Sequence, residues 1–270
     1  MSAALARLRA FLAAASGVAL VEVREAKGST PREAGAWMLV SPGGIFGTIG
    51  GGQLEFMAID RAREMIAAGT PATDLIDIPL GPEIGQCCGG RVVVDIALAD
   101  EALRAAIPQR IEREEAARPA AFIFGGGHVG HALADALSLL PLAVTVVETR
   151  ADQIRALPEG VEARVIAVPE AVVREAPAGA AFLVLTHDHA LDFLIVAEAL
   201  RRPDAAYVGM IGSKTKRATF ASWYLKEAGG GEAALSRLVC PIGGSGVKDK
   251  RPAVIAAMAA AEVMRALAAA

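Results

Sequence analysis

The stretch AAFIFGGGHVG, residues 120–130, decides the fold of the second half of the chain. Its apolar start predicts a buried strand, and its glycines stand directly before a helical pattern. Gly125, Gly127 and Gly130 match the G-x-G-x-x-G spacing, which permits a tight turn, close approach of phosphate oxygens and packing of helix on strand. Glu148 ends the next expected strand, where it can accept hydrogen bonds from ribose hydroxyls. The stretch predicts a Rossmann-like domain that binds a phosphate-bearing ligand or, alternatively, uses its glycines for packing only.

Strand and helix patterns alternate from residue 120 onward, which predicts a parallel sheet with helices on both faces. The first half differs, because it is rich in strands and has few helices. Its expected strands cover 18–26, 36–40, 45–49, 75–80 and 91–98, and a helix is expected over 53–69. We therefore expect an α/β protein with a strand-rich domain over 1–105, a linker over 106–119 and a Rossmann-like domain over 120–270.

Composition excludes several classes of protein. Of 270 residues, 54% are hydrophobic, 21% charged and 4% aromatic, so the chain is not intrinsically disordered. A net charge of −3 argues against a general nucleic-acid binder. Arg7 and Arg9 interrupt the apolar N-terminus and Glu262 the apolar C-terminal stretch, so we expect neither a signal peptide nor a membrane span. Three cysteines predict no disulfide framework, and the cytoplasm is the expected location.

Two further turns in the second half carry polar side chains. His187 and His189 flank Asp188 at the end of an expected strand. A metal site would need a third ligand, so we favour a hydrogen-bonded turn in which Asp188 caps the following helix. In the turn at 209–217, Ser213 is the expected N-cap. The cations after it oppose the helix dipole, which indicates either an anion site or a solvated charged face. These cations are Lys214, Lys216 and Arg217.

The first half contributes three glycine-framed loops. Gly50, Gly51 and Gly52 precede an expected helix and predict a concavity of N–H groups that could hold an anion. Arg32 stands in a polar loop and is available for an oxyanion. Gln86, Cys87 and Cys88 lie between glycines, where the thiols either bind metal or sulfur or are buried structural cysteines.

Five segments together resemble the XdhC/CoxI family. They are GSTPREAGAWMLV (28–40), GTIGGGQLE (47–55), GPEIGQCCGG (81–90), FGGGHVG (124–130) and THDHALD (186–192). The resemblance runs from about residue 18 to the C-terminus and implies an XdhC/CoxI domain followed by a Rossmann-like domain. Where many relatives have Leu-Asp-Ile-Gly and then Thr-Pro-Glu-Glu, this chain has GSGVKDKRP (244–252), so no role is transferred to that segment.

The resemblance implies an accessory protein for xanthine dehydrogenase and related molybdenum hydroxylases. Such a protein binds molybdenum cofactor, holds it while a cysteine desulfurase supplies the sulfido ligand, and passes it to apo-xanthine dehydrogenase. Cys87 and Cys88 are then candidates for contact with the molybdenum. The phosphate of the cofactor suits glycine-framed helix starts and nearby cations. This role is that of a carrier and insertion chaperone without turnover chemistry of its own.

Two enzymatic alternatives stay open on the sequence. The glycine motif and Glu148 also suit an NAD(P)-dependent oxidoreductase, for which the four histidines are the available acids or bases. They are His128, His131, His187 and His189. A zinc-dependent hydrolase using His187 and His189 is the weaker alternative.

Trp223 and Tyr224 are the densest aromatic pair and the candidate anchors for a partner protein or for self-association. Neighbours on a helix diverge by about 100°. We therefore expect at least one of the two to point outward, although Trp223 could instead pack in the core.

Overall fold

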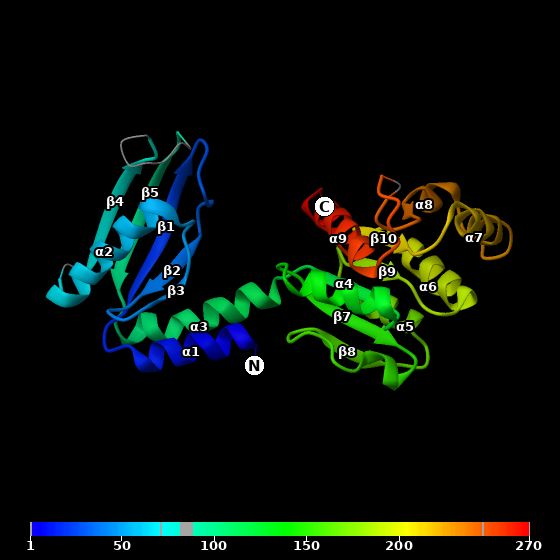
Figure 1. Ribbon diagram of the computed structural model, residues 1–270, viewed down its shortest axis with the longest axis horizontal. Helices are drawn as coiled ribbons and strands as arrows, with labels where there is room; N and C mark the ends of the chain where they lie inside the picture. Colours follow the sequence, from blue (N-terminus) through cyan, green and yellow to red (C-terminus); the bar gives the residue numbers. More distant parts are fainter. Residues whose placement is uncertain (1, 71, 82–88, 245, 270) are drawn as a thin grey trace. The chain divides into compact units, whose positions relative to one another are not determined.

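The computed structural model describes residues 2–70, 72–81, 89–244 and 246–269. It divides into two compact units, Met1–Glu114 and Glu115–Ala270 (Figure 1). The division falls within the segment 106–119 that the sequence predicts as a linker. Most of that segment instead belongs to helix α3 (Glu101–Ala116), because Ile107 and Ile111 are buried in a core of the first unit.

The first unit is built on a five-stranded antiparallel sheet with the strand order β3-β2-β1-β5-β4. The strands are β1 (Ala19–Lys27), β2 (Trp37–Val40), β3 (Ile45–Gly47), β4 (Thr73–Pro79) and β5 (Arg91–Leu98). A tight turn joins β2 to β3, in which the Ser41 N–H donates to the Gly44 carbonyl at 2.9 Å. The hairpin that the sequence predicts from Pro42, Gly43 and Gly44 is present.

Helices cover both faces of this sheet. Met38 packs in the core under α2 (Gly52–Ala68), whereas Leu39 packs with α1 (Ala3–Ala14) and α3 on the opposite face. Successive strand residues point to opposite faces, which is why these neighbours belong to different cores. Helix α2 ends at Gly69, whose φ of +67° suits the left-handed C-cap that favours glycine.

The second unit holds a six-stranded parallel sheet with the strand order β11-β10-β9-β6-β7-β8. The strands are β6 (Ala120–Phe124), β7 (Ala143–Glu148), β8 (Glu162–Val165), β9 (Ala181–Val184), β10 (Tyr207–Met210) and β11 (Leu238–Val239). The chain starts at the centre, runs outward through β7 and β8, and returns to the other side of β6. This is the doubly wound Rossmann order, and it confirms the predicted fold class.

Helices lie on both faces of the parallel sheet, as the alternation of patterns predicts. Helices α4 (His128–Ser138) and α9 (Pro252–Ala269) form one apolar core with the sheet, and α5 to α8 form the other. The latter are α5 (Glu170–Glu175), α6 (His189–Arg201), α7 (Lys214–Lys226) and α8 (Glu232–Ser236); a short 3₁₀ helix, η2 (Ala151–Ile154), follows β7.

Helix α9 is long and apolar enough to cross a membrane by length and composition. Its residues Ala256, Ala259 and Val263 are nevertheless buried in the core that α4 shares with the sheet. One helix of this kind is weak evidence for a membrane span, and one face of α9 packs in this core.

Leu8 tests the docking of α1 on the first unit. Its side chain is fully buried in the core formed with α3, so we expect Leu8→Ala to lower the free energy of unfolding by about 2–5 kcal/mol. Arg7→Ala, on the exposed face of the same helix, is the matched control and should change stability by less than about 0.5 kcal/mol. Urea unfolding followed by circular dichroism measures both, and equal effects would contradict this packing.

Candidate functional site

The carboxyl edge of the parallel sheet is where a doubly wound fold binds its ligands, at the point where the strand order reverses. That point lies between β6 and β9, which are neighbours in the sheet. The backbones that leave the two strands touch there. A Cβ on Gly125 would lie 2.4 Å from the Leu185 carbonyl oxygen, and Gly125 has a φ of +119°. Glycine at 125 is therefore required by both conformation and packing.

The other two motif glycines differ in what requires them. A Cβ on Gly130 would lie 2.0 Å from the Gly125 carbonyl oxygen, so Gly130 is needed for α4 to pack on the turn. Gly127 has an ordinary φ of −74°, and a Cβ there would meet nothing within 4 Å. Neither packing nor backbone conformation therefore requires glycine at 127, which is the N-cap of α4, a position that favours glycine over alanine. The open space in front of it is part of a cavity of about 420 Å³, lined by Gly126, His128, His131, Asp152 and Gln153 among others.

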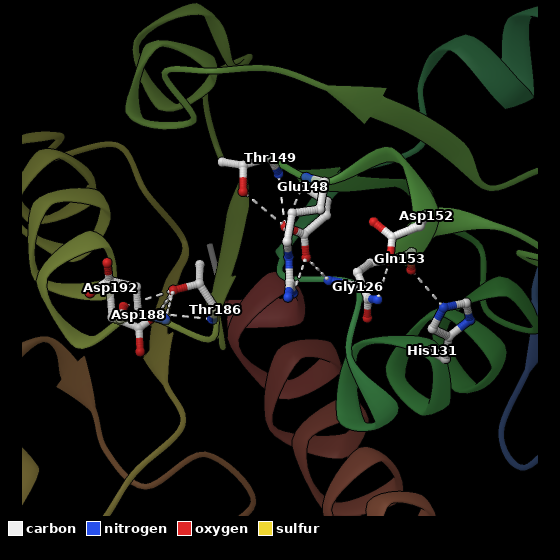
Figure 2. A network of polar contacts seen from close by, with 10 residues as sticks. Gly126, His131, Glu148, Thr149, Asp152, Gln153, Thr186, Asp188 and Asp192 are labelled. Atoms are coloured by element: carbon white, nitrogen blue, oxygen red, sulfur yellow. Dashed lines mark hydrogen bonds and ion pairs between the residues drawn. The ribbon is translucent and has the colours of Figure 1, made fainter.

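Glu148 does not face an open ribose site. Its buried carboxylate accepts hydrogen bonds from the Gly126 N–H at 2.9 Å, from the Thr149 N–H at 2.8 Å, and from the Arg150 guanidinium (Figure 2). Burial raises the pKa of Glu148, but the bonds from Arg150 and the backbone N–H groups outweigh it and lower the pKa to about 2. The residue that the sequence predicts as a ribose acceptor thus braces the glycine turn.

A second network closes the sheet edge next to β9. Asp192 of α6 is fully buried, and one of its oxygens accepts from the Thr186 N–H at 2.8 Å and from the Thr186 hydroxyl at 2.7 Å. Its other oxygen forms an ion pair with Lys216 of α7. Lys216 is therefore committed to a buried carboxylate, which corrects its assignment to cofactor binding. Burying Asp192 is tolerable only because the charge is paired and hydrogen-bonded.

The helix caps at this edge are as the sequence predicts. The Asp188 carboxylate accepts from the Ala190 N–H at the start of α6, and the Ser213 hydroxyl accepts from the Lys216 N–H at the start of α7. Ser213 thus serves its own helix. Lys214 and Arg217 make no ion pair with any described residue.

A cavity of about 880 Å³ opens at the ends of β9 and β10. Three segments line it: 186–189 after β9, 211–216 after β10, and 241–255 leading into α9. Ile211, Ile242 and Ile255 form apolar wall, and His187 and His189 lie exposed at its side. The cavity lies within the range of about 300–1,000 Å³ that small-molecule sites occupy.

The structure supports no zinc site among the residues it describes, where no three His, Cys, Asp or Glu side chains gather as metal ligands. The segment that holds His187 and His189 forms a hydrogen-bonded turn, in which the Thr186 hydroxyl donates to the Asp188 carbonyl at 2.9 Å. His131 lies in the other cavity, where its Nε2 is 2.9 Å from the Gln153 carbonyl oxygen. Burial raises the pKa of the Cys240 thiol, the one cysteine in the described part of the chain.

The glycine-rich turn of the first unit is filled by the chain itself. One oxygen of the Glu55 carboxylate accepts from the Ile49 N–H at 2.9 Å, from the Gly51 N–H at 3.1 Å and from the Thr48 hydroxyl. The predicted anion concavity of Gly50, Gly51 and Gly52 thus already holds an anion. This corrects the prediction of a cofactor site there, because an internal carboxylate takes the N–H groups.

Three family segments of the first unit meet at one end of its sheet. A Cβ on Gly50 would lie 2.6 Å from Pro31 Cβ, and a Cβ on Gly90 would lie 2.3 Å from the Ser29 carbonyl oxygen. Arg32, beside this junction, is exposed and makes no ion pair with a described residue. Gln86, Cys87 and Cys88 lie outside the described residues.

The aromatic pair of α7 is largely internal. Tyr224 is buried and stacks on Phe220, whereas Trp223 is half-buried, with its ring 5.7 Å from that of Phe193. The two side chains diverge around the helix, but neither ring is fully exposed, because Trp223 packs against Phe193 of α6 and Tyr224 against Phe220 of its own helix.

Comparison with known proteins matches both halves of the chain in this order. The model of the XdhC and CoxI family matches residues 11–78, and that of the XdhC Rossmann domain matches residues 121–263. The chain belongs to the XdhC and CoxI family. The XdhC Rossmann match includes the glycine turn, the Asp192 network and the large cavity. The segment 82–88 lies outside both matched ranges.

Two relatives of this XdhC-family chain stand out. The uncharacterized protein YqeB of Escherichia coli K12 is 24% identical over 263 residues, which are 92% of this chain and 43% of that protein. The chain thus spans less than half the length of this relative. A crystal structure described as a xanthine dehydrogenase from Bacillus halodurans superposes with a TM-score of 0.79, over 100% of this chain and 96% of that chain, at 19% identity. At this identity the likeness establishes the fold alone.

Sequence reasoning missed several residues that shape the site of this XdhC-family chain. The sequence patterns alone indicate no site role for Asp192, Tyr207 or Glu262, or for the segment after Gly243. An aspartate inside an otherwise apolar helical run was the available signal for Asp192, since a buried carboxylate needs a partner.

The pKa of Glu148 predicts a pH-dependent contribution to stability. Because the pKa falls from 4.5 to about 2 on folding, the carboxylate stabilises the protein by about 3 kcal/mol above pH 4.5, and this is lost as the pH falls toward 2. Glu148→Gln should therefore be less stable than wild type at pH 7, with the difference shrinking between pH 4.5 and pH 3. Urea unfolding at each pH measures this, with exposed Glu159→Gln as control. A difference that is independent of pH would contradict the assignment.

Substitution by alanine should affect stability much more at Gly130 than at Gly127. Gly130→Ala should lower the free energy of unfolding by about 1–3 kcal/mol, since its Cβ would collide with the Gly125 carbonyl. Gly127→Ala should cost less, at most about 1 kcal/mol, because it meets no neighbouring atom and only replaces a favourable N-cap residue. Thermal unfolding compares the two variants, and equal losses would mean that Gly127 is also needed for packing.

Proposed function

We propose that this protein is an accessory protein of a molybdenum hydroxylase. It binds molybdenum cofactor, holds it during sulfuration and delivers it to apo-xanthine dehydrogenase. The observation that carries the proposal is the cavity of about 880 Å³ at the carboxyl edge of β9 and β10, within a Rossmann unit that matches the XdhC family. Membership of the family supports an accessory role, and the cavity supplies a place for the cargo.

The chemistry of the cavity fits a pterin that carries a phosphate. A flat heterocycle suits the apolar wall of Ile211, Ile242 and Ile255, and the phosphate suits the cationic side chains and backbone N–H groups at the rim. Ligands held mainly by apolar contact and a few polar groups can be released again, which a carrier requires. In this proposal the chain positions and shields its cargo.

The thiols of Cys87 and Cys88 are proposed, on the family resemblance, to contact the molybdenum or to protect its sulfido ligand. Soft thiolate ligands suit such a centre. Arg32 is proposed to bind an oxyanion of the cargo, because it is exposed and makes no ion pair with a described residue.

The proposed partners are xanthine dehydrogenase as recipient and a cysteine desulfurase as sulfur donor, both in the cytoplasm. Self-association is a further proposal. Trp223 is the proposed contact on α7, since its ring remains half-exposed while Tyr224 is buried.

A second candidate function is binding of a nucleotide such as NAD(P) at the glycine turn. The open space in front of Gly127 and the cavity of about 420 Å³ favour it. The commitment of Glu148 to Gly126 and Arg150 argues against its use as a ribose acceptor. The glycine turn and the proposed pterin site belong to different cavities, so nucleotide binding is compatible with the carrier role.

Cargo analysis tests the proposed function. The chain is purified without oxygen from cells that make molybdenum cofactor, and molybdenum, pterin and nicotinamide are assayed in the protein fraction. We expect molybdenum and pterin in about equal amounts, and we expect Cys87→Ala and Cys88→Ala to reduce the molybdenum or its sulfuration. Gly127→Val is the control, because it should remove nucleotide binding and leave the pterin. Nicotinamide without pterin in the wild-type fraction would overturn the carrier function in favour of the oxidoreductase.

A further inference from the structure

The described residues between β11 and α9 form one wall of the large cavity, and hydrogen bonds tie their start to the rest of the unit. We call its described residues, 243–244 and 246–251, the basic strap. At its start the Gly243 N–H donates to Glu262 at 2.9 Å, and the same carboxylate oxygen accepts from the buried Tyr207 hydroxyl at 2.8 Å. Burial and Glu262 raise the pKa of Tyr207, so its hydroxyl stays a donor. These bonds tie the start of the strap to α9 and β10.

Near the end of the strap, two of its own residues form a local ion pair. Asp249 accepts from the Arg251 N–H at 2.9 Å and from its Nε at 2.8 Å, directly before α9 begins at Pro252. Val247, Lys248, Asp249 and Lys250 of the strap line the cavity. The strap therefore holds its two lysines at the cavity wall.

The charges at the cavity do not balance. Lys216 is neutralised by buried Asp192, and Asp249 is neutralised by Arg251. Lys248 and Lys250 are exposed and form no ion pair with any residue in the described ranges. Two positive charges are thus left facing the cavity, opposite apolar wall from Ile211, Ile242 and Ile255.

This combination selects a chemical class of ligand. The apolar wall favours a flat, uncharged ring in the ligand. Two cations two residues apart favour a ligand group that carries about two negative charges. A phosphate monoester carries about −1.5 to −2 at pH 7, whereas a carboxylate carries at most −1. Ammonium groups also form their strongest hydrogen bonds with ionised acceptors.

We propose that Lys248 and Lys250 bind the phosphate monoester of a heterocyclic ligand in this cavity and determine its preference for phosphorylated over unphosphorylated ligands. The proposal rests on the proposed function only for the identity of the heterocycle. The shared chemistry is a phosphate monoester on a flat ring, and its source is either a pterin phosphate or a nucleotide.

Paired probes test the strap. Fluorescence titration compares 6-hydroxymethylpterin phosphate with 6-hydroxymethylpterin, and calorimetry compares adenosine monophosphate with adenosine. We expect one phosphorylated probe to bind at least about tenfold more tightly than its unphosphorylated partner. The double variant Lys248→Gln, Lys250→Gln should lose this preference, whereas Lys226→Gln, exposed at the far end of α7, should keep it. Higher salt should weaken phosphate binding in the wild type.

The outcomes separate the strap from its cargo. Tighter binding of adenosine monophosphate than of the pterin phosphate, lost in the double variant, would assign a nucleotide to the cavity and leave the role of the lysines intact. Three results would overturn the proposal. The phosphorylated and unphosphorylated probes could bind equally, none of the four probes could bind, or the double variant could keep the preference for phosphate. All variants should unfold at the wild-type temperature, because both lysines are exposed.

Loading with molybdenum cofactor distinguishes this proposal from the proposed function. If the wild-type chain carries no cofactor while the double variant loses its phosphate preference, the carrier function fails and the strap assignment holds. If the wild type and the double variant carry equal amounts of cofactor and the double variant also keeps its phosphate preference, the strap assignment fails and the carrier function holds.

Discussion

The buried carboxylate of Asp192 constrains the whole carboxyl edge of the Rossmann unit. A buried charge is costly unless it is paired and hydrogen-bonded, so Thr186 after β9 and Lys216 of α7 must both reach it. This requirement fixes the end of β9, the start of α6 and the first turn of α7 relative to one another. Two of the three segments that line the large cavity are held by this one group.

At three glycine-containing turns, a carboxylate of the chain accepts hydrogen bonds from the backbone N–H groups. Glu55 fills the glycine turn of the first unit, Glu148 braces the glycine turn after β6, and Glu262 fastens the turn at Gly243. In each case the protein supplies the anion that a free N–H group would otherwise take from solvent or ligand. A glycine-rich loop is therefore an ambiguous signal, because its N–H groups can be satisfied from within.

The best indications of a ligand site are residues whose space or charge the protein itself does not fill or neutralise. Gly127 has open space where a side chain would fit, and Lys248 and Lys250 face a cavity without a described ionic partner. Neither the open space at Gly127 nor the pair of lysines is required by packing among the described residues. Such features are expected where a fold has been adapted to a ligand, because function is carried by sites placed on a scaffold.

The sequence by itself determined the Rossmann fold of the second unit, its alternation of strands and helices, and the caps at Asp188 and Ser213. These depend on local spacing, on turn residues and on apolar periodicity, which neighbours in the chain determine. It also determined the family, through segments whose residues stand close together in the chain.

Only the tertiary structure decided which polar groups are free. Lys216 and Glu148 meet partners 24 and 22 residues away along the chain, and Tyr207 meets Glu262 over 55 residues. No local pattern encodes such contacts, because they depend on how strands and helices pack. For the same reason, most of the predicted linker 106–119 is the end of helix α3. Its isoleucines are buried only because α3 packs with α1 on one face of the antiparallel sheet.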